Sequence, residues 1–524
     1  MRKIDNRKLI LQTGTSDFNR PCHTPLAICI WKNGLIVQIR YGKTDKFVDY
    51  PVVKTDESLY NKAVSLDREV YSVIHRKIEN ELQRFHDSKE KKAMLITGAR
   101  QVGKTFIIRE FGKQYDSFIE INFYENKSAQ SLFENAGSRA DLLLRLSAIA
   151  NAPLIPGKTL IFLDEVQECK EIVTAVKFLV EEGSYQYILS GSLLGVDLKD
   201  IRSVPVGYMD VFEMYPLDFE EFACANKVST AIIAKLRQSF QDRTPVDDVI
   251  HEKMMELFRL YLIVGGMPAA VMRYLETNNL QEVLREQHSI ITLYKRDIAR
   301  YDPDEKLYLE DIFDLIPSEL NAKNKRFILK NLNENFKFSR YSHSFLWLRD
   351  AGVALPTFCA NEPTVPLLLS KATNLFKLFL SDVGLLVAMY MNDIQIKILN
   401  REQDINFGSI YENAAAQELK AHGFDLYYFN SKKQGELDFL IEQDGAVLPI
   451  EIKSGKDYTK HAALSNVMAN PDYAIPEAYV FHNGNVSITG SVAYLPIYML
   501  MFVERRQSEE KMVYKLDLRV LQGE

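Results

Sequence analysis

The sequence is poor in cysteine and in net positive charge. Its five cysteines are odd in number and scattered, with no Cys-x-x-Cys pair. This usage argues against a disulfide framework and a cysteine-based zinc site, and it favours a reducing compartment. The formal net charge is −6, which excludes a global basic surface of the kind that grips nucleic acid unaided. We also find no internal repeat and no low-complexity segment.

Long apolar runs are absent as well. The stretch at residues 492–503 has 12 residues and contains a proline, whereas a membrane-spanning helix needs about 20 apolar residues. We expect a buried element there. Residues 1–11 are too charged for a secretory signal. The expected location is therefore cytoplasmic, with no membrane partner.

A complete phosphate-binding motif is present in MLITGARQVGKTFIIREFG, residues 94–112. The spacing Gly, four residues, Gly-Lys-Thr lets backbone N–H groups converge on phosphate oxygens, while the lysine reaches the β- and γ-phosphates and the threonine binds Mg²⁺. A flanking apolar run predicts a strand before the loop and a helix after it. A glycine-rich turn without a ligand is the alternative. The predicted ATP-binding residues are Gly98, Ala99, Arg100, Gln101, Val102, Gly103, Lys104 and Thr105.

Two later stretches complete the pattern of a nucleotide hydrolase. LIFLDEVQ (160–167) is an apolar strand that ends in two carboxylates, of which Asp164 is placed to hold Mg²⁺ and Glu165 to polarise the attacking water. YQYILSGS (185–192) is a further strand, and its Ser190 is placed to sense the γ-phosphate, although Ser-Gly-Ser is also ordinary turn chemistry. The predicted catalytic residues of an ATPase are Glu165, Lys104 and Ser190.

A second constellation lies in GELDFLIEQDGAVLPIEIKSG, residues 435–455. It predicts two strands joined by a turn at Asp444-Gly445. Glu451 and Lys453 are two residues apart and share one face of their strand, and the hairpin can bring Asp438 onto that face.

These residues form an Asp…Glu-x-Lys set, which metal-assisted phosphodiester hydrolysis requires. The helix predicted at residues 408–423 carries Glu412, a further candidate ligand. We expect Glu412, Asp438 and Glu451 to bind a second Mg²⁺ or Mn²⁺, with Glu451 and Lys453 as the catalytic pair. An ordinary surface Glu–Lys pair is the alternative. Residues 406–503 carry six basic and eleven acidic residues, a net charge of −5 that disfavours independent DNA binding.

A basic cluster precedes this region. Between residues 321 and 340 six positive side chains face a single acid, Glu334, within helical runs that are followed by two strands, the order of a winged helix. The cluster is a candidate for phosphate contacts, and a solvated face is the alternative. The positive residues are Lys323, Lys325, Arg326, Lys330, Lys337 and Arg340.

These motifs together resemble a large group of bacterial and archaeal ATP-binding proteins with an AAA-type ATPase core and an uncharacterised C-terminal domain. The matching pieces, in order, are GARQVGKT, LIFLDEVQE, YILSGS, VFEMYPLDFEEF, GGMPAAV, FLWLRDAGV, FKLFLSDVGLL, YENAAAQEL and GELDFLIE…LPIEIKSG. The resemblance covers roughly residues 67–500 and implies an α/β fold. Its parts are a P-loop parallel-sheet core, a helical lid, a winged-helix segment and a C-terminal domain similar to PD-(D/E)xK nucleases.

The expected domains follow from these pieces. They are an N-terminal extension (1–65), the ATPase core (66–229), the lid (230–300), a winged-helix-like segment (301–405), the nuclease-like domain (406–503) and a charged tail (504–524). One departure is Tyr208, where many relatives carry a basic residue. Arg202 is the nearest candidate for an arginine finger.

We therefore expect an ATPase that couples hydrolysis to action on nucleic acid through a metal-dependent nuclease-like domain. The alternative is an ATPase switch whose nuclease-like domain is inactive and binds protein or DNA. A phosphotransferase is disfavoured, since no acceptor-site signature follows the loop. The expected partners are nucleic acid or protein, and the sequence indicates no oligomeric state.

Overall fold

The computed structural model describes residues 74–505 and residue 516, with gaps at 89, 131–132, 134–138, 193–206, 302–305, 323–324, 328–337, 391–393, 401–406 and 456. The extension at residues 1–65 and the charged tail, apart from its described residues, lie outside this range. All described residues belong to one compact unit that begins at Ile74.

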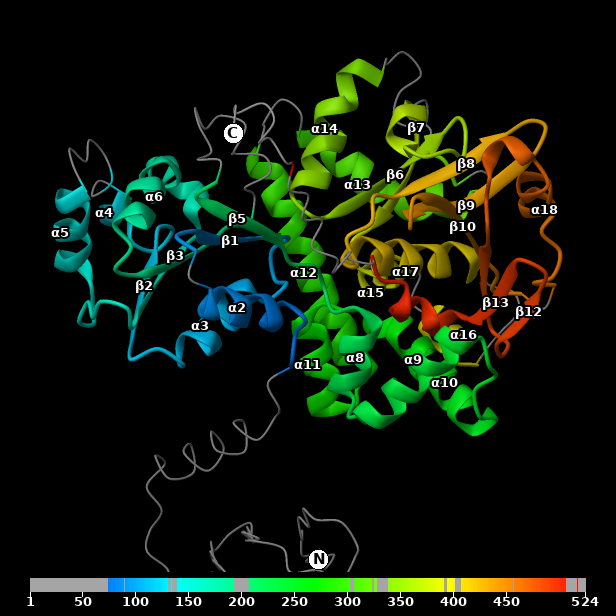
Figure 1. Ribbon diagram of the computed structural model, residues 1–524, viewed down its shortest axis with the longest axis horizontal. Coiled ribbons are helices and arrows are strands. Elements are labelled where there is room, and N and C mark those ends of the chain that lie inside the picture. The colour runs from blue at the N-terminus through cyan, green and yellow to red at the C-terminus, as the bar shows by residue number, and fades with distance from the viewer. Residues whose placement is uncertain are drawn as a thin grey trace, which may run out of the picture. The chain divides into compact units, whose positions relative to one another are not determined.

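The first half of this unit is built on a five-stranded parallel sheet with the strand order β2-β3-β4-β1-β5. Its strands are β1 (Ala93–Thr97), β2 (Ser117–Asn122), β3 (Thr159–Asp164), β4 (Gln186–Ser190) and β5 (Met209–Glu213). The central strands β1, β3 and β4 are apolar along nearly their whole length because helices cover both faces of the sheet. The parallel register brings the carboxyl ends of β1, β3 and β4 to one edge (Figure 1).

Helices accompany this sheet. They are α2 (Ile78–Asp87), α3 (Lys104–Gly112), α4 (Lys127–Gln130), α5 (Arg139–Ile149), the 3₁₀ turn η1 (Val166–Glu168) and α6 (Lys170–Glu182). The predicted α/β class with a P-loop parallel sheet is confirmed.

A helical region follows the sheet, as the pattern of residues 230–300 predicts. It comprises α8 (Phe219–Ala225), α9 (Thr230–Asp242), α10 (Asp248–Val264), α11 (Pro268–Thr277) and α12 (Leu280–Tyr301). The sequence Gly-Gly-Met-Pro at residues 265–268 interrupts this pattern and predicts a break between helices, and the break between α10 and α11 is confirmed. Gly266 is required there because an added Cβ would lie 2.0 Å from the carbonyl oxygen of Leu217, and Pro268 begins α11 in the position that proline favours.

The second half is built on an eight-stranded mixed sheet with the order β12-β13-β11-β10-β9-β8-β6-β7. Its strands are β6 (Ala354–Ala360), β7 (Lys371–Leu380), β8 (Tyr427–Ser431), β9 (Gly435–Gln443), β10 (Ala446–Ile452), β11 (Ala478–His482), β12 (Ser487–Thr489) and β13 (Val492–Pro496). The predicted hairpin at Asp444-Gly445 is confirmed, with both turn residues at positive φ.

The strand pair predicted after residue 350 is also present, as the antiparallel hairpin β6–β7. Its strand β6 pairs in parallel with β8, so this hairpin shares one sheet with the C-terminal strands. The helices α13 (Lys306–Asn321) and α14 (Phe338–Asp350) precede it. This keeps the helix-then-hairpin order of a winged helix, which stays a prediction.

Helix α17 (Phe407–Ala421) is buried along most of its length and packs against β6, β7 and β10 (Figure 1). The other elements of this half are α15 (Val383–Met389), α16 (Ile394–Asn400), α18 (Ala462–Met468) and the 3₁₀ turns η4 (Leu367–Ser370), η5 (Pro471–Tyr473) and η6 (Ile497–Phe502). The buried element predicted at residues 492–503 is confirmed as β13 and η6.

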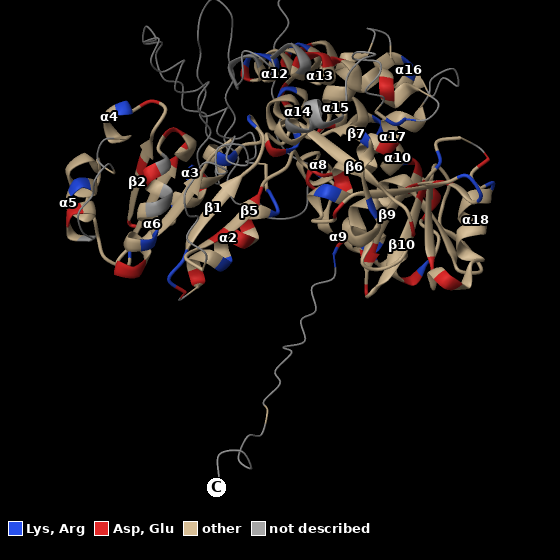
Figure 2. Cartoon of the chain, turned by 90° about the horizontal axis from the view of Figure 1, so that it is seen from above, with Lys and Arg blue, Asp and Glu red and all other residues tan. Residues whose placement is uncertain are grey.

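Charges of both signs are interspersed over the described elements (Figure 2). None of the described helices is both long and apolar enough to cross a bilayer.

Candidate nucleotide-binding site

The P-loop leaves β1 and enters α3 through a backbone that only certain residues adopt. Gly98, Gln101 and Gly103 have φ angles of 134°, 67° and 95°. At Gly98 space also excludes a side chain, because an added Cβ would lie 2.1 Å from the carbonyl oxygen of Met214. The strand–loop–helix predicted for residues 94–112 is therefore confirmed, and its first glycine is required by a close backbone approach.

Lys104 is buried at the start of α3. Its Nζ donates to the carbonyl oxygens of Gly98 and Ala99, each at 2.8 Å. Burial lowers the pKa of Lys104 to about 8, although the carboxylates of Glu165 and Asp164 oppose this shift. A desolvated ammonium whose hydrogen bonds go to neutral carbonyls favours an anion beside it, which is what a bound phosphate supplies.

Asp164 is the point on which the neighbouring strand ends converge. It ends β3 and is 2% exposed. The hydroxyl of Thr105 donates to its carboxylate at 3.2 Å, the amide of Asn122 donates at 3.1 Å, and the hydroxyl of Ser190 donates to it as well. Burial raises the pKa of Asp164, while the hydrogen bonds from Ser190 and Thr105 oppose the shift.

This oxygen-rich arrangement fits the Mg²⁺ that accompanies ATP. Mg²⁺ prefers carboxylate and hydroxyl oxygens and keeps several waters. Thr105 and Asp164 supply a hydroxyl and a carboxylate on adjacent elements, as predicted. In this arrangement the hydroxyl of Ser190 donates a hydrogen bond to the carboxylate of Asp164.

Glu165 follows directly and has a left-handed backbone, with φ 55° and ψ 48°. Such a conformation is uncommon for a residue with a side chain and recurs at functional sites. Its N–H donates to Asp164 at 3.1 Å, and its carboxylate accepts from Nε2 of Gln167. The predicted water-activating residue is thus adjacent to the predicted magnesium ligand, with Gln167 as an orienting partner.

Sequence reasoning missed Asn122 and Gln167. Asn122 ends the alternating strand SFIEIN beside β3, so a polar residue closing a strand next to a catalytic strand was the available signal. Gln167 lies two residues after Glu165, and nothing in its immediate context marks it.

Contacts from distant segments also reach the P-loop. Arg100 forms a 2.6 Å ion pair with Asp297 of α12, and the hydroxyl of Tyr294 donates to the carbonyl oxygen of Arg100 at 3.0 Å. Gly352, in the turn between α14 and β6, sits so close to Ala99 that an added Cβ would lie 2.9 Å from its backbone nitrogen. The helical region and the second half of the unit therefore both bear on the loop.

A cavity of about 500 Å³ opens beside the first residues of the P-loop. Thr97, Gly98 and Ser192 line it from the carboxyl ends of β1 and β4, and Arg349 and Lys371 line it from the second half of the unit. Its walls carry charges of both signs.

The predicted C-terminal residues are brought together, but lysines occupy the centre of the group. Glu412 is 1% exposed, and Nζ of Lys377 lies 3.5 Å from its carboxylate, while Nζ of Lys325 forms a second ion pair with it. Lys377 also pairs with Glu436 at 2.9 Å. Burial and the charge of Asp438 raise the pKa of Glu412, although both lysines oppose the shift.

The carboxylates of Asp438 and Glu451 are also compensated by groups of the chain itself. Asp438 accepts a hydrogen bond from the Ile452 N–H at 2.9 Å, and Lys453 pairs with Glu451 at 2.7 Å. Burial and the charge of Asp438 raise the pKa of Glu451 to about 8. Burial raises the pKa of Asp438, but the charges of Lys377 and Lys325 outweigh burial and hold this pKa below its ordinary value.

The fit of this group to a second divalent cation is poor. Among the described residues, no three His, Cys, Asp or Glu side chains are placed to hold a metal ion. The ammonium groups of Lys377 and Lys325 take the place beside Glu412 that a cation would need. The expected second Mg²⁺ or Mn²⁺ at Glu412, Asp438 and Glu451 gains no support.

Two members of the basic cluster can be placed. Lys325 turns inward to Glu412, and Arg326 lies 3.9 Å from the carboxylate of Glu436. The side chains of the other members, Lys323, Lys330, Lys337 and Arg340, lie outside the described residues. Arg202, the arginine-finger candidate, does too, and Tyr208 donates to Glu181 at 2.8 Å.

Three segments match known family models. Residues 90–223 match an AAA domain. Residues 255–396 and 407–500 each match a domain of unknown function, DUF8612 and DUF4143 respectively. Neither description names a nuclease, so the expected nuclease likeness is not supported by these matches. A comparison with curated proteins found no match.

Solved structures similar to this chain include three archaeal proteins. The Walker-type ATPase PABY2304 of Pyrococcus abyssi is 14% identical, with a TM-score of 0.38 over 61% of this chain and 96% of that chain. The Aeropyrum pernix Orc1 protein in complex with DNA is 12% identical (TM-score 0.25, 61% and 93% covered). Cdc6p from Pyrobaculum aerophilum is also 12% identical (TM-score 0.23, 64% and 98% covered). At these TM-scores the likenesses say nothing about what this chain binds.

The AAA-domain match covers the same residues that form the parallel sheet and its phosphate-binding loop. Within it, three donors from separate elements converge on Asp164. Residues 90–223 therefore form an ATPase domain of the P-loop AAA type.

Proposed function

We propose that this chain hydrolyses ATP at residues 98–105 and uses the cycle to switch a C-terminal domain that binds a partner without cutting it. The observation that carries the ATPase half is the convergence of Thr105, Ser190 and Asn122 on the buried Asp164. Such a carboxylate is costly to bury unless hydrogen bonds and a cation compensate it.

In this function the residues of the first half have distinct roles. The loop N–H groups and Lys104 bind the phosphates, and Lys104 exchanges its carbonyl partners for phosphate oxygens. Thr105 and Asp164 hold the Mg²⁺, which neutralises charge on the β- and γ-phosphates when bound. Glu165, oriented by Gln167, positions the attacking water.

Phosphate release from Mg·ATP by the full chain tests this half. Asp164→Asn removes the charge that faces Mg²⁺ and should lower the turnover rate by about a hundredfold or more. Asp210→Asn is the matched control, because Asp210 lies on β5 of the same sheet and pairs with Lys92 at the surface. Equal turnover in the wild type and Asp164→Asn would overturn the proposal.

The non-cutting C-terminal half is supported by the lysines. Lys377 and Lys325 form ion pairs with Glu412, so side-chain cations of the chain itself compensate the negative charge of this carboxylate cluster. Opening a metal site there would require moving two ammonium groups out of a buried cluster, which costs their charge pairing.

Metal-dependent nuclease action on nucleic acid is the second candidate, favoured by the gathering of Asp438, Glu451 and Lys453. Plasmid nicking with Mg²⁺ or Mn²⁺, with and without ATP, separates the two. We expect no nicking by the wild type. Nicking that Asp438→Ala abolishes would establish the nuclease instead.

A further inference from the structure

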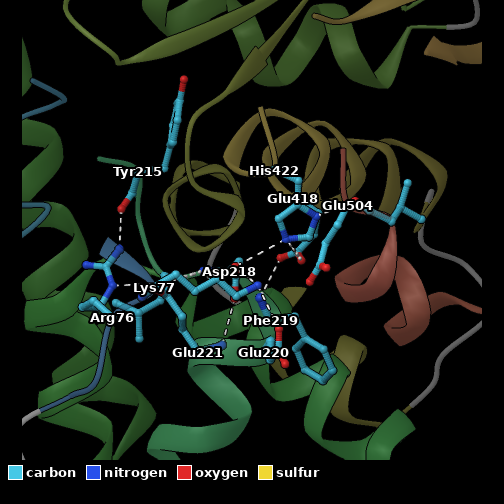
Figure 3. A network of polar contacts seen from close by, with 12 residues as sticks. Arg76, Lys77, Tyr215, Asp218, Phe219, Glu220, Glu221, Glu418, His422 and Glu504 are labelled. Atoms are coloured by element: carbon cyan, nitrogen blue, oxygen red, sulfur yellow. Dashed lines mark hydrogen bonds and ion pairs between the residues drawn. The ribbon is translucent and has the colours of Figure 1, made fainter. Parts of the chain in front are cut away.

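Arg76 is a buried arginine that contacts the P-loop from outside it. It precedes α2 and lies upstream of the segment that matches the AAA domain. Its Nη1 donates to the carbonyl oxygen of Val102 at 3.0 Å and its Nη2 to that of Tyr215 at 2.7 Å, while its Nε donates to Glu221 at 3.1 Å (Figure 3). Each nitrogen of the guanidinium group therefore has an acceptor.

The contact with Val102 bears on a phosphate-binding group. The carbonyl of Val102 and the N–H of Gly103 belong to one planar peptide unit and point in opposite directions. Holding that carbonyl therefore fixes the direction of the Gly103 N–H, one of the donors that the loop offers to phosphate. Gly103, on the nitrogen side of this peptide, is left-handed, and so is Gln101, the residue before Val102, so regular structure does not fix the plane of the peptide.

Arg76 is itself held rigidly. Glu221, which accepts from its Nε, also accepts from the Lys77 N–H at 2.6 Å and forms a capping box with Asp218 at the start of α8. In this box the Glu221 N–H donates to Asp218 at 2.8 Å, and the Asp218 N–H donates to Glu221 at 3.2 Å. The carboxylate of Glu221 is thus fixed on both of its oxygens.

Helix α17 and His422, the residue that follows it, contact the same first turn of α8. Glu418 of α17 accepts from the Phe219 N–H at 2.7 Å, and Nε2 of His422 lies 3.4 Å from the carboxylate of Asp218 (Figure 3). Lys77 pairs with that carboxylate at 2.8 Å. A continuous set of buried polar contacts therefore joins the P-loop to the C-terminal half.

We propose that Arg76 is a positioning residue for nucleotide binding, and that α17 acts on the P-loop through it. The proposal rests on ATP binding at the P-loop, as in the proposed function. Glu418 and His422 hold the start of α8, Glu221 holds Arg76, and Arg76 sets the Val102–Gly103 peptide. Because coupling of binding free energies is reciprocal, nucleotide bound at the loop stabilises the contacts of α17 in turn.

Calorimetric titration of the full chain with Mg·ATP tests the positioning role. Arg76→Gln should raise the Kd by about tenfold, and Arg76→Lys, which keeps the charge but loses the fork, should fall between it and the wild type. Arg237→Gln is the matched control. Arg237 forms ion pairs with Glu220 of α8 and with Glu504, both at 3.0 Å, and not with the loop. The Kd of Arg237→Gln for Mg·ATP should therefore stay within about twofold of the wild-type value.

The outcomes are separable. Absence of ATP binding by the wild type defeats the proposed function itself. Wild-type affinity in folded Arg76→Gln, or an equal loss in Arg237→Gln, overturns the positioning role. If Arg76→Gln does not fold, Glu221→Gln replaces it, since it keeps the shape of the box and removes the charge that orients Arg76. Wild-type affinity in that variant also overturns the role.

Hydrogen exchange tests the link to α17. Mg·ATP should slow amide exchange across residues 407–421 in the wild type and should do so much less in Arg76→Lys at saturating nucleotide. Equal protection of α17 in both proteins, or none in the wild type, would show that the C-terminal half does not sense the loop through Arg76.

Discussion

At the scale of single residues, Lys104 shows how burial prepares a cation for an anionic ligand. Among the described residues, its ammonium donates hydrogen bonds to the carbonyls of Gly98 and Ala99 alone, and burial lowers its pKa to about 8. We expect Lys104→Ala to abolish measurable ATP binding in calorimetry, because the charge-assisted phosphate contacts are lost. Lys113→Ala, which removes an exposed lysine at the end of the same helix, should bind normally. Unchanged affinity in Lys104→Ala would refute the assignment.

Glu165 should act in hydrolysis rather than in binding, since it follows Asp164, the proposed magnesium ligand, and its hydrogen bonds within the described residues are to Asp164 and Gln167 rather than to the loop. Glu165→Gln keeps the shape but loses the base, so ATP should bind with normal affinity and turn over on the order of a hundredfold more slowly. The exposed Glu168, three residues later, supplies the control Glu168→Gln. A normal turnover rate in Glu165→Gln would show that another group positions the water.

Gly98 and Gly157 both have positive φ, at 134° and 73°, but differ in surroundings. An added Cβ at Gly98 would meet the Met214 carbonyl at 2.1 Å, whereas at Gly157 nothing lies within 4 Å. Gly157→Ala should cost about 1 kcal/mol of unfolding free energy from backbone strain alone. Gly98→Ala should cost about 1–3 kcal/mol more, because the segment after β5 must move. Urea denaturation of the two variants measures the difference, and equal losses would contradict the close approach.

At the scale of elements, α17 carries a pH-sensitive contact with α8. Burial and the charge of Asp218 raise the pKa of Glu418 to about 8. Burial lowers the pKa of His422, but the hydrogen bond with Asp218 outweighs burial and raises this pKa above its ordinary value. The groups that face Glu418 are the Asp218 carboxylate and the Phe219 N–H from α8, the Tyr261 hydroxyl from α10, His422 and Lys77.

The raised pKa values of Glu418 and His422 change the unfolding free energy with pH in the same direction. A group with a raised folded-state pKa binds its proton more tightly when folded, so its contribution is complete below the unfolded pKa and is lost as pH rises through the folded value. We expect unfolding free energy to fall between pH 5 and about pH 8–9, at up to about 1.4 kcal/mol per pH unit for each proton released. Glu418→Gln, which mimics the protonated acid, should flatten this decline in urea denaturation. An identical slope in the variant would rule out Glu418 as a source.

Several elements were predictable because their signals are local. The P-loop strand and helix, the Asp444-Gly445 hairpin and the break at residues 265–268 each depend on residues within one short window. The joining of β6 to β8 was not predictable, because about 70 residues separate the paired positions Phe358 and Tyr427 and neither strand marks its neighbour.

The candidate site divides in the same way. Lys104 and Thr105 were predictable from the spacing of the phosphate-binding motif, and Asp164 and Glu165 from their place at the end of an apolar strand. Contacts such as Arg100–Asp297 could not be found, since they arise only when the helical region folds back onto the loop. Arg76 was missed for the same reason, since two of its acceptors are backbone carbonyls that carry no sequence signal and the third is the carboxylate of Glu221, 145 residues away in the sequence.

At the scale of the whole molecule, Lys377 ties three segments together. It lies on β7 and is fully buried, and it pairs with Glu412 of α17 and with Glu436 of β9. A fragment that begins at residue 406 would lack this lysine together with β6 and β7, so the carboxylates must be tested in the full chain. Removing one partner of a buried ion pair leaves an uncompensated charge, which is more costly than removing both.

We therefore expect Lys377→Met to lower unfolding free energy by about 3–5 kcal/mol in urea denaturation, and Lys433→Met, an exposed control, to change it by less than about 0.5 kcal/mol. Adding Glu412→Gln to Lys377→Met should recover about 0.5–3 kcal/mol, because the unpaired carboxylate is then gone. The cluster would thus be held by its own lysines. Wild-type stability in Lys377→Met, or no recovery in the double variant, would show that Glu412 is neutralised by something other than this lysine.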